Sequence, residues 1–263
     1  MLKGKKVLII GMMSERSIAY GVADAMHGFD ANLGFSCMAR FEERIKKMSQ
    51  PWSPFMLNVC DVSKDEDIKR LAQDVAKTGK IDAIVHSIAF APRDHLEGGI
   101  LKNLTREGFQ TAHDISVYSL AAVTKACLPY MNDHGAIVAL TYLGSSKIIP
   151  NYNVMGPAKA SLESMVRYLA YDCGTRGIRV NAVSAGPVRT PAASGIKNMG
   201  KMLTRVASCS PIQQTITTTQ IGNATAFLCS DLSSGITGEV LFVDNGYHAM
   251  GVVTDTLTEA ATS

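Results

Sequence analysis

Short runs of apolar residues alternate along the chain with longer segments of helical period. This alternation predicts βαβ units around a parallel sheet that is covered on both faces. The apolar runs predict seven strands, at residues 6–10, 33–38, 55–59, 83–87, 136–142, 179–184 and 240–243. Right-handed crossovers then give an α/β, doubly wound sheet of the Rossmann type, with its ligand at the carboxyl ends of the strands.

The pattern predicts a single dinucleotide-binding and catalytic domain over residues 1–263, because one α/β domain can bury the core of a chain of this length. Glycines and prolines flank a helical stretch between residues 186 and 211, which predicts a mobile substrate lid. The last dozen residues, 252–263, are rich in threonine and lack a core-forming pattern, so we expect them to be loose or to lie on a neighbouring subunit.

Charge and cysteine usage narrow the class of partner. The net charge is +3 with acids and bases interspersed, which argues against nucleic-acid binding and favours a small molecule. The six cysteines form no Cys-x2-Cys pair and mostly lie in apolar segments, so we expect buried thiols in a reducing cytoplasm and no metal site. We see no signal pattern or membrane-length apolar stretch and expect a soluble, cytoplasmic protein.

Tyr152 and Lys159 are seven residues apart, about two helical turns or roughly 10 Å of rise, so they can share one helical face. An ammonium there can hold a ribose and lower the pKa of the phenol, while the phenol faces a substrate, as nicotinamide chemistry requires. A second phenol, Tyr142, ends an apolar run ten residues upstream. The spacing also occurs by chance on solvated helices, so its meaning depends on the rest of the chain.

The segment after the first predicted strand lacks the common G-x-G-x-x-G pattern but keeps a turn glycine, Gly11, and a second glycine, Gly21. Ser17 can cap the helix that follows or donate to a phosphate. Backbone N–H groups at this helix start would face a cofactor pyrophosphate, and Gly21 would let helix and strand approach closely. An ordinary βα turn with a capping serine is the alternative.

Five motifs occur in order: G-x5-S-I-A-x-G from Gly11, HSIAFA at 86–91, YLGS at 142–145, Tyr152-x6-Lys159, and RVNAVSAGP at 179–187. Together they resemble the NAD(P)H-dependent enoyl-acyl-carrier-protein reductases of bacterial type II fatty-acid synthesis, a divergent branch of the short-chain dehydrogenase/reductases. The likeness covers residues 2 to about 251. Its most specific part is Tyr-x9-Tyr-x6-Lys, since ordinary members of the superfamily carry a serine where this chain has Ala139.

The resemblance implies reduction of a trans-2-enoyl thioester by hydride transfer to the β-carbon, the last step of the elongation cycle. Negative charge grows on the thioester oxygen, and Tyr152 is the implied donor to it. Lys159 would bind the nicotinamide ribose. Tyr142 would position the thioester or help to relay a proton, with a structural role as the alternative. His86 lies in an apolar strand, and we interpret it as a satisfied structural histidine.

Cofactor and substrate contacts follow from the same resemblance. The implied cofactor contacts are Gly11, Ser17 and Ile18 at the pyrophosphate, Asp61 and Val62 at the adenine, Ile88 behind the dinucleotide, and Val188, Arg189, Thr190, Pro191 and Ala192 along the nicotinamide. The implied substrate contacts are Ala91, Tyr142, Met155, Ile196 and Met199. Asp61 has an equal alternative as a cap before Ser63. Ala89, where a glycine is common, narrows the pocket wall.

Met38, near the end of the second strand, replaces the residue that helps to decide between cofactors in the resembled family. No acidic side chain follows that would hold the NAD ribose or repel a 2′-phosphate. Arg40 could pair with such a phosphate, or form ion pairs with Glu42 and Glu43 on a solvated helix start. We expect NADH as the cofactor, with NADPH as the alternative.

The implied partners are an acyl carrier protein with its trans-2-enoyl thioester, and triclosan-like or diazaborine-like inhibitors. We expect a homotetramer formed through two long helices, at about residues 111–131 and 152–174. Within the lid, an apolar stripe can line an acyl channel or simply pack; its members are Ile196, Met199, Met202 and Leu203. Basic residues recur on the other side and suit either the carrier or solvent; they are Lys197, Lys201 and Arg205.

Two prolines depart from the pattern of the resembled family. Pro157 would leave the Asn153 carbonyl unpaired if the helix already starts near Asn151, and Pro191 stiffens the lid. Two other functions compete: a ketoacyl or other carbonyl reductase of the superfamily, which should carry the serine that Ala139 replaces, and a non-enzymatic nucleotide sensor, which should lose one of the two phenols or the lysine.

Overall fold

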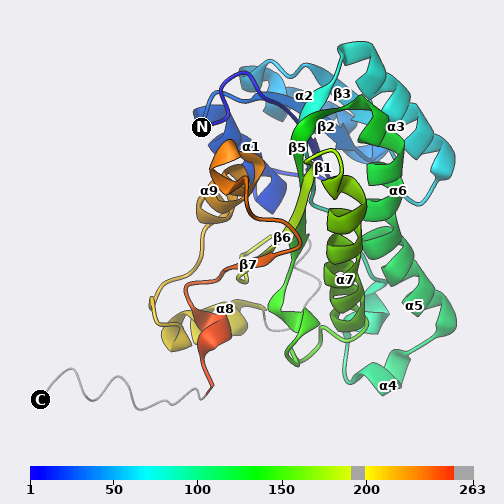
Figure 1. Cartoon of the computed structure of the whole chain (residues 1–263). Coiled ribbons are helices and arrows are strands. Elements are labelled where there is room, and N and C mark those ends of the chain that lie inside the picture. Colours follow the sequence, from blue (N-terminus) through cyan, green and yellow to red (C-terminus); the bar gives the residue numbers. More distant parts are fainter. Residues whose placement is uncertain (191–198, 252–263) are drawn as a thin grey trace, which may run out of the picture.

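A computed structural model describes residues 1–190 and 199–251. Within them, seven parallel strands form one sheet in the order β3-β2-β1-β4-β5-β6-β7 (Figure 1). The strands are β1 (Lys6–Ile10), β2 (Asn32–Cys37), β3 (Met56–Val59), β4 (Ile81–His86), β5 (Met131–Thr141), β6 (Arg179–Ala185) and β7 (Val240–Val243). The seven predicted strands and the Rossmann-type architecture are confirmed. The order reverses between β1 and β4, where such sheets bind their ligands.

Helices cover both faces of the sheet (Figure 1). They are α1 (Ile18–Gly28), α2 (Glu42–Ser49), α3 (Asp65–Thr78), α4 (Ile100–Asn103), α5 (Arg106–His113), α6 (Ser119–Cys127), α7 (Met155–Gly174), α8 (Met199–Cys209) and α9 (Thr218–Cys229). Neighbouring residues of a strand face opposite layers, as the pleat requires. Leu8 packs into the layer of α3, α6 and α7, whereas Val7 packs into that of α1, α2 and α9.

The largest differences from the predicted boundaries lie in β5 and in the helix predicted at 111–131. Strand β5 begins at Met131 rather than at residue 136, because the polar segment at 132–134 extends the strand without an apolar signature. The helix predicted at 111–131 is present, but its hydrogen-bond pattern changes within it. A π-helical turn (Asp114–Tyr118) separates α5 from α6, and α6 ends at Cys127, where a 3₁₀ turn containing Pro129 follows.

Helices α1 and α9 cross at two glycines. A Cβ on Gly21 would collide with the backbone of Thr218, and a Cβ on Gly222 would collide with the carbonyl oxygen of Gly21. The prediction that Gly21 brings a helix close to a strand is therefore wrong, since it brings α1 close to a second helix. The two helices can cross this closely because neither Gly21 nor Gly222 carries a side chain.

The described residues contain no helix that is long and apolar enough to cross a membrane. All six cysteines are buried and unbridged, as their apolar surroundings predict. The predicted lid falls partly, and the tail at 252–263 wholly, outside the described residues. The lid, the tail and the single-domain division stay predictions.

Candidate active site

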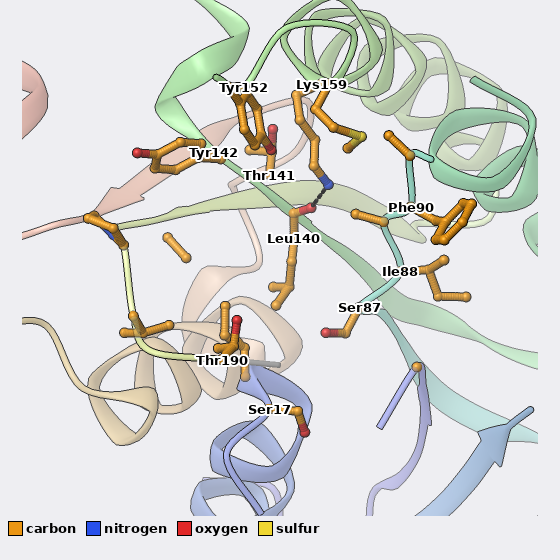
Figure 2. A pocket seen from close by; sticks show the side chains of 18 of the residues that line it. Ser17, Ser87, Ile88, Phe90, Leu140, Thr141, Tyr142, Tyr152, Lys159 and Thr190 are labelled. Atoms are coloured by element: carbon orange, nitrogen blue, oxygen red, sulfur yellow. Dashed lines mark hydrogen bonds between the residues drawn. The ribbon is translucent and has the colours of Figure 1, made fainter. Parts of the chain in front are cut away.

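A cavity of about 520 Å³ opens at the carboxyl ends of β1, β4, β5 and β6 and is closed on one side by the start of α7. Most of the residues predicted for the site line it: Gly11, Ser17, Ile18, Ile88, Ala91, Tyr142, Tyr152, Met155, Lys159, Val188 and Thr190. Ala89 is also part of the wall. Figure 2 shows Ser17, Ile88, Tyr142, Tyr152, Lys159 and Thr190 around the cavity, on segments that are far apart in sequence.

Tyr152 does not lie on the helix that carries Lys159. Helix α7 begins at Met155, and Tyr152 lies in the preceding turn, where Asn151 and Asn153 adopt left-handed conformations with φ of 64° and 41°. Asparagine tolerates this region better than most residues, so it ends the extended chain before the helix. The predicted shared helical face is therefore wrong, although the turn still brings the phenol and the ammonium to one cavity.

The start of α7 also removes the concern about Pro157. The proline lies in the first helical turn, where its missing N–H would have had no partner within the helix. The carbonyl of Asn153 accepts a hydrogen bond from the Gly156 N–H at 3.0 Å, so it is not left unpaired. Pro157 thus fits the helix start without bending it.

The two phenols pack edge to face, with ring centroids 5.0 Å apart and an interplanar angle of 74°. Gly144 makes room for this pair, because a Cβ there would collide with the ring of Tyr152. Burial raises the pKa of Tyr142 to about 12 and raises the pKa of Tyr152 as well. Both phenols are therefore protonated at neutral pH and can donate. The predicted lowering of the Tyr152 pKa by Lys159 is not seen.

Lys159 is buried, and its Nζ donates to the carbonyl oxygen of Leu140 at 2.7 Å (Figure 2). Burial lowers the pKa of Lys159 to about 8, and the nearby carboxylate of Glu163 partly opposes this shift. Thr141, which follows Leu140 at the end of β5, donates from Oγ1 to Glu163 Oε1 at 2.7 Å. The ammonium thus contacts a strand-end carbonyl, and the carboxylate that opposes the shift lies one helical turn further along α7.

His86 is fully buried at the end of β4, and its Nε2 lies 2.8 Å from Ser119 Oγ. Because Ser119 donates to the carbonyl of Ile115, the histidine must donate from Nε2, which leaves Nδ1 without a partner in the described residues. Burial, reinforced by Lys159, lowers the pKa of His86 to about 3. The ring is neutral, and only one of its nitrogens is satisfied.

The turn after β1 is shaped to admit a ligand. Gly11 has φ of 101°, and a Cβ there would collide with the carbonyl oxygen of Ser87. Ser17 caps α1 by accepting from the Tyr20 N–H at 3.3 Å, and its hydroxyl donates to the carbonyl of Ser14 at 2.6 Å. Free N–H groups at the start of α1 lie beside this loop and suit an anion.

Several predicted residues lie away from the cavity wall. Met38 is 39% exposed beyond β2, and Val62 is buried in the core. The Asp61 carboxylate accepts from the N–H and the hydroxyl of Ser63, but α3 begins at Asp65 with Lys64 as its N-cap, so Asp61 does not cap the helix as predicted. Arg189 lines a second, open hollow on the outer side of α8, together with Lys201 and Arg205.

Other predictions cannot be placed. Pro191, Ala192, Ile196 and Lys197 lie outside the described residues, and Met199 is described only as the first residue of α8. Met202 of the same predicted stripe lines the cavity, and Leu203 is buried.

Sequence reasoning missed part of the wall. The missed lining residues are Met13, Ser87, Phe90, Arg93, Leu96, Leu140, Thr141, Ala185, Gly186 and Pro187. Strand ends were the available signal, because Ser87, Thr141 and Ala185 each lie at or next to the last residue of a predicted strand. Arg93 and Leu96, by contrast, lie on a 3₁₀ turn (Arg93–Leu96) that no periodicity predicts.

Comparisons with known proteins agree with this geometry. A family model described as Enoyl-(Acyl carrier protein) reductase matches residues 11–248. The chain is 49% identical over 257 residues to the enoyl-(acyl-carrier-protein) reductase (NADH) FabI of Neisseria meningitidis serogroup B, with 97% of this chain and 98% of that protein covered.

Two solved structures superpose closely on the fold. The enoyl-(acyl-carrier-protein) reductase (NADH) from Aquifex aeolicus gives a TM-score of 0.92 at 48% identity, covering 95% of this chain and 99% of that one. The Bacillus cereus enoyl-acyl carrier protein reductase with NADP+ and indole naphthyridinone gives 0.93 at 40% identity, covering 95% and 98%. Both likenesses extend over the residues that form the cavity.

Proposed function

Because the chain belongs to the enoyl-(acyl carrier protein) reductase family, we propose that it reduces the trans-2 double bond of enoyl thioesters with NADH, in the last step of the fatty-acid elongation cycle. The observation that carries the proposal is that Tyr142, Tyr152 and Lys159 meet in one cavity at the switch point of the sheet. The partner that presents the substrate is an acyl carrier protein.

The residues present fit a dinucleotide. Gly11 leaves open the space that a side chain would fill, and the N–H groups at the start of α1 can receive the pyrophosphate. The Ser14 hydroxyl in this loop is buried without a partner in the described part of the chain, so a phosphate oxygen can satisfy it. Ile18, Ile88, Val188 and Thr190 then line the length of the cofactor, which when bound supplies the hydride.

The phenols serve the substrate oxygen. Hydride addition at the β-carbon moves negative charge onto the thioester oxygen, and a preorganised donor stabilises that charge most effectively in a dry site. Tyr152, protonated at neutral pH, donates to this oxygen. Lys159 holds the nicotinamide ribose hydroxyls and keeps the local potential positive. Tyr142, whose hydroxyl points away from Lys159 in Figure 2, positions the thioester or relays the proton.

The alternative of a carbonyl reductase has less support. Position 139, where such enzymes are expected to carry serine, holds an alanine that is fully buried in the core on β5. No hydroxyl at that position can therefore bind a ketone oxygen. A nucleotide sensor is disfavoured by the retention of both phenols and the lysine around the cavity.

NADH is the proposed cofactor, as in the name of the Neisseria relative. The Arg40 guanidinium lies over the ring of Phe41, 4.8 Å from its centroid, so it is already engaged by an aromatic face. The Bacillus cereus relative was solved with NADP+, which keeps a minor NADPH activity as an outcome to be measured.

We propose that the basic hollow formed by Arg189, Lys201 and Arg205 docks the acidic carrier beside the cavity. Substitution Lys201→Ala should raise KM for a carrier-bound enoyl thioester and weaken its salt dependence. A coenzyme A thioester of the same acyl group is the control, since it lacks the protein surface. Equal effects on both substrates would remove the docking role.

The finer predictions stay proposals. One of them is a homotetramer formed through α5, α6 and α7. Tyr168 and Tyr171 on α7 are 73% and 85% exposed, which suits such an interface. Light scattering on the purified protein tests this assembly. Triclosan-like or diazaborine-like inhibitors bind in the cavity beside Tyr152 and Ala91, where the Ala89 methyl narrows the wall. The cytoplasmic location also remains a prediction.

The deciding experiment follows nicotinamide absorbance with purified protein. A trans-2-enoyl thioester and a 3-ketoacyl thioester are offered separately, each with NADH and with NADPH. Oxidation of NADH by the enoyl substrate alone is the expected result. Turnover of the ketoacyl substrate alone would transfer the protein to the carbonyl reductases, and cofactor binding without any turnover would favour the sensor.

A further inference from the structure

Helix α7 is fixed to the end of β5 at two points that lie one helical turn apart. Lys159 donates to the carbonyl of Leu140 at 2.7 Å, and Glu163 accepts from the hydroxyl of the next residue, Thr141, also at 2.7 Å. Thr141 is buried and lines the cavity, whereas Glu163 is half-buried. Residues four apart on a helix are neighbours, so the carboxylate and the ammonium lie on one face.

The described groups around Lys159 are neutral except for one carboxylate. From β4 comes His86, which is neutral, and from β5 comes the Leu140 carbonyl. The turn before α7 contributes the protonated Tyr152. Among the described groups, Glu163 supplies the negative charge that opposes the effect of burial on the ammonium. Without it, a buried cation would face neutral groups, which favours loss of its proton.

We propose that Glu163, oriented by the Thr141 hydroxyl, is a positioning residue that keeps Lys159 protonated at neutral pH and thereby able to donate to the ribose of the cofactor. The inference rests on the proposed function for the identity of that ligand. The short bond from Thr141 fixes the carboxylate one helical turn from Lys159, and the adjacent strand-end carbonyl fixes the ammonium itself. One strand end therefore sets both the position and the charge of Lys159.

The test is the affinity for NADH as a function of pH, measured by fluorescence between pH 6 and pH 10 without any substrate. Wild-type protein should lose affinity as pH rises through about 8, where Lys159 loses its proton. In Glu163→Gln the inflection should move down by about one pH unit, which makes binding about fivefold weaker at pH 8 and leaves it equal at pH 6. An inflection that stays in place overturns the proposal, as does a wild-type affinity that is independent of pH.

Two further variants keep the test decisive if Glu163→Gln folds poorly. Thr141→Val should shift the inflection in the same direction by a smaller amount, and Thr141→Ser, which keeps the hydroxyl, should restore it. Equal behaviour of the valine and serine variants overturns the orienting role. Glu239→Gln, the same chemical change at an exposed site at the amino end of β7, should leave the pH profile unchanged.

The outcome is separable from that of the proposed reaction because the measurement is binding alone. NADH binding with the expected shift, but without reduction of enoyl thioesters, would overturn the reaction and retain the role of Glu163. Normal enoyl reduction with an unmoved inflection would overturn the role of Glu163 and retain the reaction.

Discussion

The two halves of the sheet approach the same cavity with different chemistry. The half formed by β1–β3 contributes Gly11, Met13, Ser17 and Ile18 to its wall, and none of these side chains titrates. The half formed by β4–β7 contributes both phenols, and with α7 the buried ammonium, all with shifted pKa values. The first half thus recognises a ligand by backbone shape, whereas the second handles protons and charge. Binding and turnover should therefore be separable by mutation.

The largest effect should come from Tyr152→Phe in the second half. Loss of the donor to the thioester oxygen should lower kcat by about 10²–10⁴-fold while the Kd for NADH stays the same, because the first half is untouched. Steady-state kinetics with an enoyl thioester and a separate NADH titration measure the two quantities. Unchanged turnover would show that Tyr152 is not the donor.

Tyr142→Phe provides the matched comparison to this variant. A rise in KM with little change in kcat would assign Tyr142 to positioning of the thioester. A fall in kcat comparable with that of Tyr152→Phe would assign it to the proton relay.

Gly11→Ala should impair ligand binding by the half of the sheet formed by β1–β3. The new Cβ meets the Ser87 carbonyl and occupies a left-handed backbone conformation, which should cost about 2 kcal/mol or more in unfolding free energy and weaken NADH binding more than tenfold. The rate at saturating NADH should be largely retained. Gly28→Ala, where no atom lies within 4 Å of the added group, is the control. Equal affinities in the two variants would contradict the backbone role.

Lys159→Met should stabilise the fold in a pH-dependent way. Burial lowers the pKa of Lys159 to about 8 from 10.5, so the unfolded chain binds more protons between these pH values. The cost to folding is therefore complete below pH 8, about 3 kcal/mol, and disappears above pH 10.5. The unpaired Leu140 carbonyl offsets part of the gain at every pH. Chemical denaturation at pH 7 and pH 10 measures the difference, and a difference that is independent of pH would refute this explanation.

Met38→Asp should have the smallest effect of these substitutions. It tests whether the half of the sheet formed by β1–β3 also decides between NADH and NADPH. A carboxylate beyond β2 would repel a 2′-phosphate and accept from the ribose hydroxyls, so the ratio of kcat/KM for NADH to that for NADPH should rise about tenfold. Met38→Asn separates charge from size. If both variants leave the ratio as it is, cofactor choice is made elsewhere in the cavity.

The apolar runs predicted every strand because the central strands are buried on both faces and the edge strands β3 and β7, although only partly buried, are also mainly apolar. Where that apolar signature is missing, as at 132–134 at the start of β5, the predicted strand was too short.

The spacing of Tyr152 and Lys159 predicted the right residues for the cavity but placed both on one helix, which is wrong. The left-handed Asn151 and Asn153 end the extended chain, and a periodicity argument does not detect single residues of this kind.

Other parts of the site depend on tertiary contacts that no motif encodes. The bond from Thr141 to Glu163 joins a strand end to a helix 22 residues later, and neither residue belongs to a recognised pattern. The raised pKa of Tyr152 likewise results from burial, which overrides the influence expected of a neighbouring lysine. The sequence therefore predicts which strand ends meet, whereas the electrostatics of the site require the packed structure.

The glycine crossing of α1 and α9 has a consequence for the order of folding. The helix whose start is the proposed pyrophosphate site packs against a segment about 200 residues later in the chain (Figure 1). Contacts of such separation form late and require the closure of a long loop. During synthesis, the first β-strand and its glycine turn leave the ribosome long before Thr218–Cys229 can support α1. We therefore expect a nascent chain to gain its full affinity for the proposed cofactor only near the end of translation.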